Sequence, residues 1–179
     1  MKTFIALVAV AALLACGAYL VYTVKAYDRY SVPSSGMEPT ILKDEGIMVD
    51  RHAYDRAEPR RGDVVIVQHQ PENVFMVKRV IAIGGDTIEG RDSHVFVNGL
   101  ELDEPYIQHI NKNAVVRFMN DFGPVKVGPG QLFVMGDNRD IAYDSRQPEF
   151  GLVPMSELRG KVLTIGFSRT FSRIGKKVH

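Results

Sequence analysis

The sequence predicts a mainly β protein that is preceded by one N-terminal transmembrane helix. Three observations carry this prediction. An uncharged apolar run fills residues 4–24, short apolar segments separated by turn formers recur after it, and no later stretch has a long helical period. A chain of 179 residues has room for one medium domain, which we expect to be an antiparallel β-sheet core with a small β lobe.

The apolar run is long enough to cross a bilayer. A helix of about 21 residues spans roughly 30 Å, the thickness of the hydrocarbon core. Residues 1–25 are therefore predicted to be a retained anchor. A cleaved secretory signal behind Lys2 and a lipoprotein processing site at Cys16 are the alternatives. The apolar run continues well past Cys16, which favours the anchor.

Apolar segments of strand length follow the anchor in order. They are Val64–Val67, Val74–Ile83, Val95–Val97, Ala114–Met119, Leu132–Val134 and Val162–Ile165. Glycine, proline and aspartate cluster between them, as turns require. Asn98-Gly99 predicts a type I′ hairpin turn. Residues 155–158 are expected to form a short turn, and the basic tail 173–177 a frayed, solvated end.

Composition excludes several classes of function. The formal net charge is +1, which gives no reason to expect a nucleic-acid partner. The only cysteine is Cys16, so no disulfide framework and no cysteine-based metal site are expected. The five histidines show no ligand spacing. We therefore expect neither a metal nor another cofactor.

Lys78 lies in the apolar segment 74–83, where residues two apart share a face of a strand. The other side chains on its face are all apolar: Val74, Met76, Val80 and Ala82. An amine among apolar side chains loses affinity for its proton, so its pKa falls towards the range of a general base. The alternative interpretation is an edge-strand lysine whose amine reaches solvent.

Two further segments complete the pattern. Residues 32–41 read Val-Pro-Ser-Ser-Gly-Met-Glu-Pro-Thr-Ile, and residues 136–146 read Gly-Asp-Asn-Arg-Asp-Ile-Ala-Tyr-Asp-Ser-Arg. The Asp, Asn and Arg density of the second is typical of a loop tied by charge-assisted hydrogen bonds. Together with Met76-Val77-Lys78-Arg79-Val80, these segments resemble the bacterial type I signal peptidase (leader peptidase) family. The family consists of membrane-bound serine peptidases with a Ser/Lys dyad, and the resemblance covers nearly the whole chain.

The resemblance implies that Lys78 is the general base and that residue 36 is the nucleophile position. The family has serine there, whereas Gly36 has no side chain that could attack a carbonyl. Ser35 is the candidate for a displaced nucleophile, although an extended chain points its side chain to the opposite face. A kink at the glycine would be needed to turn it inward. Ser34 is a further candidate.

The resemblance also assigns binding and supporting roles. The Gly36 N–H and the Ser34 hydroxyl would bind the oxyanion. Shallow pockets for small residues would be lined by Val32, Pro33, Met37 and Met76, with the substrate bound as an added strand.

Further roles fall on the polar loop. Asp144 and Arg146 would pair beside the lysine, with Asp137, Asn138 and Arg139 supporting the loop. The family often has a serine at the position of Ala142 that bonds the lysine, and alanine cannot do so.

By resemblance, residues 26–179 form an extracytoplasmic β domain, with about 90–126 as a reduced second lobe. The protein would be a single-pass protein of the cytoplasmic (inner) membrane, with this domain facing the periplasm or the cell exterior. Its partners would be the membrane and the signal peptides of secretory preproteins.

Two hypotheses follow for function. The first is a signal peptidase I-type endopeptidase that removes signal peptides at the outer membrane face, or a specialised peptidase for a narrow substrate set. The second is a catalytically impaired homologue, a pseudoenzyme, that binds signal sequences or an active paralogue without cutting.

Overall fold

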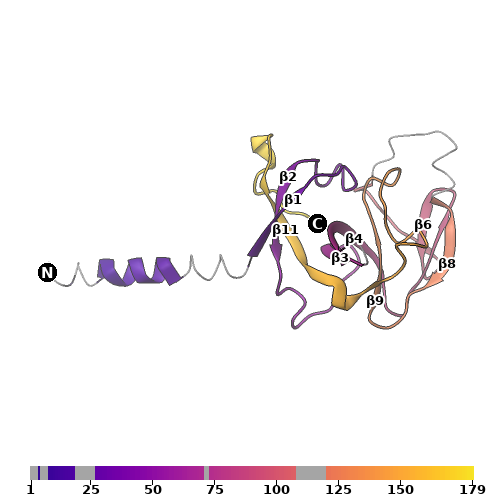
Figure 1. The fold of residues 1–179 in the computed structure, drawn as a ribbon, viewed down its shortest axis with the longest axis horizontal. Helices are drawn as coiled ribbons and strands as arrows, with labels where there is room; N and C mark the ends of the chain where they lie inside the picture. The colour runs from indigo at the N-terminus through magenta and orange to yellow at the C-terminus, as the bar shows by residue number, and fades with distance from the viewer. Residues whose placement is uncertain (1–3, 5–7, 19–26, 71–72, 108–119) are drawn as a thin grey trace.

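The computed structural model describes residues 4, 8–18, 27–70, 73–107 and 120–179 (Figure 1). Residues 8–18 are helical and lie within the predicted anchor. Within these described ranges, no helix combines the length and the apolar character needed to cross a membrane. Much of the predicted anchor, residues 1–25, lies outside the described residues.

The larger of two antiparallel sheets has seven strands in the order β1-β2-β11-β3-β4-β9-β10. These are β1 (Tyr27–Val32), β2 (Glu45–Asp50), β3 (Val64–His69), β4 (Val74–Ile83), β9 (Gln131–Met135), β10 (Val153–Pro154) and β11 (Leu158–Phe167). Two short 3₁₀ helices, η1 (Met155–Glu157) and η2 (Phe171–Arg173), flank β11. The predicted mainly β, antiparallel fold is therefore confirmed.

Burial explains why these segments form strands. In β2 every second residue is buried, which is the period-two pattern of a strand with one covered face. The first four residues of β3 are all buried, because a central strand is covered on both faces. In β4 burial begins at Lys78 and continues to Ala82, so the strand enters the core at the lysine.

The second sheet has four strands in the order β7-β6-β5-β8 and lies beside the larger sheet (Figure 1). They are β5 (Thr87–Arg91), β6 (His94–Val97), β7 (Leu100–Glu101) and β8 (Phe122–Lys126). Asn98 and Gly99 between β6 and β7 have φ of 54° and 79°, as a type I′ turn requires. An apolar cluster that includes Ile88, Val95 and Phe133 packs this sheet against β4 and β9.

The C-terminal segment folds back along β11. Val178 N–H donates to the Leu163 carbonyl over 2.9 Å, and the Val178 side chain is buried in the core beneath β1 and β2. Arg173 is held by the Glu45 carboxylate. The prediction of a frayed tail was wrong, because one apolar residue and one ion pair attach the segment to the sheet.

The strand predictions were incomplete in other places. The strands β1, β2, β5, β8 and β10 were not predicted. Residues 27–32, 87–91, 122–126 and 153–154 lack a continuous apolar run of strand length, and residues 45–50 mix apolar and acidic side chains. The predicted segment Ala114–Met119 lies outside the described residues. The short turn predicted at residues 155–158 corresponds to η1.

Candidate active site

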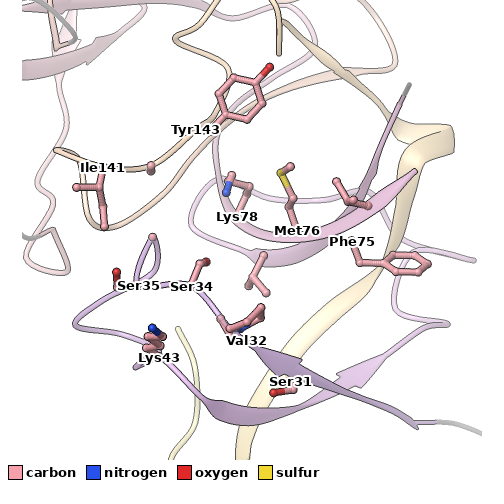
Figure 2. Close-up of a pocket in the computed structure, with 15 residues that line it drawn as sticks. Ser31, Val32, Ser34, Ser35, Lys43, Phe75, Met76, Lys78, Ile141 and Tyr143 are labelled. Carbon is pink, nitrogen blue, oxygen red and sulfur yellow. The ribbon is translucent and has the colours of Figure 1, made fainter. Parts of the chain in front are cut away.

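A groove of about 530 Å³ brings the three sequence motifs together (Figure 2). One wall comes from the end of β1 and the loop after it, and a second wall comes from the first half of β4. The third comes from the polar loop after β9. The lining of the groove includes Val32, Ser34, Gly36, Met76, Lys78 and Ala142.

Two unpaired strand edges border this groove in the described part of the chain. β1 is the outermost strand and pairs with β2 alone. β4 pairs with β3 from Val74 to Arg79, whereas β9 joins its other edge only from Arg79 onward. The backbone groups of residues 74–78 on that edge are therefore available to an added strand.

Lys78 is 7% exposed and lines the groove from β4. Val80 on the same face is apolar and fully buried. The expectation that Ala82 shares this face was wrong, because a β-bulge between Val80 and Ala82 pairs Ala82 with Phe133 and turns it into the apolar cluster on the other face. Burial lowers the pKa of Lys78, because a charged amine loses its hydration there. The Asp144 carboxylate opposes this by raising the pKa, and the Arg146 guanidinium lowers it further.

Gly36 occupies a place where a side chain would fit. A methyl group added to it would lie 3.9 Å from the Ala142 Cβ and 3.9 Å from the Ser34 Oγ, which is ordinary van der Waals contact. Its φ lies outside the left-handed region, so its backbone conformation is open to other residues. The loop therefore does not require glycine at this position.

The same contacts fix the direction of the neighbouring serines. Because the Ser34 Oγ lies 3.9 Å from the added methyl group, Ser34 and residue 36 present their side chains to the same side of the loop. Figure 2 shows Ser35 pointing away from Lys78, on the other side of the loop. Ser35 also lines the groove, as do Val32, Pro33 and Met76. Met37 is 1% exposed and packs into the apolar core.

The loop after β9 holds the backbone of the Ser35-Gly36 segment. Asn138 N–H donates to the Gly36 carbonyl over 3.1 Å, and Asn138 Nδ2 donates to the Ser35 carbonyl over 3.2 Å. Gly136 permits this contact, because a Cβ there would lie 2.5 Å from the Gly36 oxygen and 2.4 Å from the Ala142 Cβ. The glycine is thus required by close approach of two chain segments.

Asp144 and Arg146 form a buried ion pair next to the lysine. Arg146 Nε and Nη2 donate to the two carboxylate oxygens of Asp144, each over 2.9 Å, and both side chains are at most 1% exposed. Asp144 also accepts the Gly136 N–H over 2.9 Å. Arg146 Nη1 donates to the Arg139 carbonyl over 2.8 Å and to the Asn120 side chain. The pair therefore ties both ends of the polar loop together.

Arg79 faces away from Lys78 and organises the other side of the site. It donates from Nε and Nη2 to Asp137, over 2.8 and 2.6 Å. Its Nη1 donates to the main-chain oxygens of Gly62 and His179, over 2.8 and 2.7 Å. Asp137 accepts a further hydrogen bond from the Thr40 hydroxyl, just after the Gly36 loop. Sequence reasoning did not assign Arg79 a role.

The small lobe supplies two residues that sequence reasoning also missed. Glu104 pairs with Arg139, with side chains 5% and 2% exposed, and Arg139 Nε donates to the Gly136 carbonyl. The Tyr106 ring lies 3.9 Å from the Arg79 guanidinium. No local sequence signal marks these residues, since their partners lie far along the chain. Among the described residues, no cluster of three or more His, Cys, Asp or Glu side chains could hold a metal ion.

Comparison with known proteins agrees with this arrangement. A family described as signal peptidase, peptidase S26, matches residues 2–167. The chain is 38% identical to a signal peptidase I of Bacillus licheniformis over 137 residues, 75% of this chain and 73% of that protein. It is 32% identical to a probable signal peptidase I of Mycobacterium leprae over 88% of this chain and 74% of that protein.

A solved structure gives the same result. The crystal structure of a signal peptidase I from Enterococcus faecalis superposes with a TM-score of 0.51 at 31% identity, covering 60% of this chain and 98% of that one. The similarity includes the groove-forming segments, since the family match extends from residue 2 into β11. The chain belongs to the signal peptidase family, peptidase S26.

Proposed function

We propose that this protein binds the cleavage region of secretory signal peptides in the groove and that its peptidase reaction is impaired. The observation that carries the proposal is the combination of an open peptide groove, lined by Lys78, with a glycine at the position in that groove where the family has serine. The two free strand edges supply backbone partners for an extended peptide. Gly36 supplies no hydroxyl for an acyl-enzyme.

Shape and chemistry of the groove support a substrate with small side chains. Its lining includes the apolar side chains of Val32, Met76 and Ala142, and among the residues that the structure describes its only charged members are Lys43 and Lys78. Tyr30 of β1 and Phe75 of β4 have ring centroids 5.6 Å apart, so the two edges approach each other at one end. A strand with alanine at alternate positions suits this space.

We place the protein in the cytoplasmic membrane, with residues 1–25 as its anchor and the β domain on the outer side. The support is the uncharged run of residues 4–24 together with the helical residues 8–18. A signal peptide leaving the bilayer would then meet the groove near the membrane surface. An active paralogue that cuts the bound peptide is the natural partner of such a protein.

Binding of a labelled peptide tests the proposal. Fluorescence anisotropy with the full chain in detergent should show saturable binding of a peptide spanning an Ala-X-Ala site. A peptide with lysine in place of both alanines should bind at least about tenfold more weakly, which corresponds to about 1.4 kcal/mol. N-methylation of alternate amides should weaken binding, whereas N-methylation of the intervening amides should not. Equal affinity for all four peptides would refute added-strand binding.

A second candidate is an active endopeptidase with a displaced Ser/Lys dyad. Two observations favour it. The pKa of Lys78 is lowered, and the Ser34 Oγ lies on the side of the loop to which a side chain at residue 36 would point. Ser35 would need the loop to turn over, because its side chain points to the other side in Figure 2. Rapid cleavage of an Ala-X-Ala preprotein that is abolished by Ser34→Ala or Ser35→Ala would establish this candidate.

A further inference from the structure

We propose that this protein hydrolyses its bound peptide by direct attack of a water molecule held between Gly36, Ser34 and Lys78, without an acyl-enzyme. The inference rests on the proposed function, since it needs the scissile carbonyl to lie beside Gly36 in the same groove. If it holds, the bound peptide is hydrolysed slowly rather than only bound.

The space for this water lies over Gly36. The nearest atoms to an added methyl group are 3.9 to 4.0 Å away and belong to Ala142 and Ser34. A serine oxygen would be tied to its own Cα through two covalent bonds. A free water keeps a contact distance of roughly 3.5 Å from carbon. It therefore lies farther from the Gly36 Cα than a serine oxygen would, and nearer the bound peptide.

Polar partners for the water come from opposite walls. Ser34 and Lys78 both line the groove, and Figure 2 shows their side chains facing it from the β1 loop and from β4. A bound water needs about two to four polar partners, and the hydroxyl and the amine supply two. Ala142, which is 3% exposed, closes the apolar side of the space.

Lys78 is suited to act on this water. Its amine is buried in the groove wall, and burial lowers its pKa, which increases the neutral fraction that can accept a proton. The Asp144–Arg146 pair beside it fixes the local charges. No other described lysine combines burial with a place in the groove, since Lys43 is exposed on its rim.

The reaction balances with water as the only co-reactant. Lys78 takes one proton from the water while the water oxygen bonds to the carbonyl carbon, and the carbonyl oxygen becomes an oxyanion. When the C–N bond breaks, the leaving nitrogen takes that proton from the lysine ammonium. The products are the carboxylic acid of the signal peptide, which then ionises, and the amine of the mature chain.

Single-turnover cleavage tests this route. The full chain in detergent is mixed in excess over a peptide spanning an Ala-X-Ala site, and products are followed by mass spectrometry. Lys78→Met should slow cleavage by roughly 10²–10⁴-fold, the usual contribution of a general base. Gly36→Ala fills the water space and should slow it by roughly 10²-fold, the effect of a misplacement of about 1 Å. Lys126→Met, an exposed lysine of the small sheet, should leave the rate unchanged.

A second measurement needs no variant. With glycylglycine amide present, an acyl-enzyme would transfer its peptide to this amine, which is too large for the water space. Direct hydrolysis gives no such product, and the acid-quenched protein keeps its unmodified mass. A transfer product, an acylated protein, or wild-type cleavage no faster than that of Lys78→Met would overturn the inference. Peptide binding measured on the same samples separates the outcomes: binding without cleavage refutes this inference alone, and no binding refutes the proposed function.

Discussion

The main-chain N–H of Asn138 donates a hydrogen bond to the carbonyl oxygen of Gly36 over 3.1 Å. The loop that carries residue 36 is thus held by the polar loop after β9, whatever side chain residue 36 has. Asn138 also binds the Ser35 carbonyl through its side chain. The backbone geometry of the site therefore does not depend on a hydroxyl at residue 36. Substitutions at this residue can be tested without a change in the loop.

Gly36→Ser should create a faster peptidase. The added Cβ fits at 3.9 Å from its neighbours, and its Oγ would share a side of the loop with Ser34, in the groove that Lys78 lines. Restoring the nucleophile of a dyad is expected to raise cleavage of an Ala-X-Ala preprotein by roughly 10²–10⁴-fold over wild type. Gly36→Ala is the matched control and should show no gain. A folded Gly36→Ser protein that cuts no faster than wild type would contradict an intact scaffold.

Lys78→Met should change how stability depends on pH. The pKa of Lys78 is lowered by burial, so between its folded pKa and the ordinary value of 10.5 the unfolded chain binds more protons than the folded one. The contribution of this lysine to stability therefore rises as pH rises through that window. Urea midpoints should show the variant gaining most at neutral pH, with a gain that shrinks towards pH 10. A constant difference across this range would mean that Lys78 is not desolvated.

Asp137→Asn should destabilise the domain by about 3–5 kcal/mol, because it leaves the buried Arg79 without its charge partner. Both side chains of the pair are at most 1% exposed. Asp44→Asn is a suitable comparison, since Asp44 and its partner Arg169 are exposed and their pair is expected to contribute about 0–1 kcal/mol. Chemical denaturation measures both changes. Equal losses in the two variants would refute a special role for the buried pair.

Glu104→Gln should weaken peptide binding as well as stability. The carboxylate pairs with Arg139, whose Nε holds the Gly136 carbonyl next to Gly36, so loss of the charge loosens the polar loop. We expect a loss of about 1–3 kcal/mol in unfolding free energy. Glu101→Gln in the same lobe is the control, because its pair with His94 is exposed. Anisotropy titrations measure peptide binding by both variants. If both bind the peptide as tightly as wild type, the small lobe does not support the groove and this prediction is wrong.

Local pattern predicted the parts of the site that depend on one strand or one loop. The apolar neighbours of Lys78 within residues 74–83 predicted its burial, and the alternation of an extended chain predicted that Ser35 points away from the side of residue 36. Partnerships over long separations left no such signal: Glu104 meets Arg139 35 residues later, and Glu45 meets Arg173 128 residues later. The strand β1 was missed because it lies at the edge of the sheet and is only partly covered. Its sequence therefore tolerates Asp28 and Arg29 and shows no apolar run.

The room around Gly36 has a genetic consequence. Glycine codons GGU and GGC differ from the serine codons AGU and AGC by a single base. Because neither φ nor any neighbouring atom opposes a side chain at residue 36, no second mutation is needed to accommodate the change. A gene that carries either glycine codon can therefore gain a hydroxyl at residue 36 through one base change.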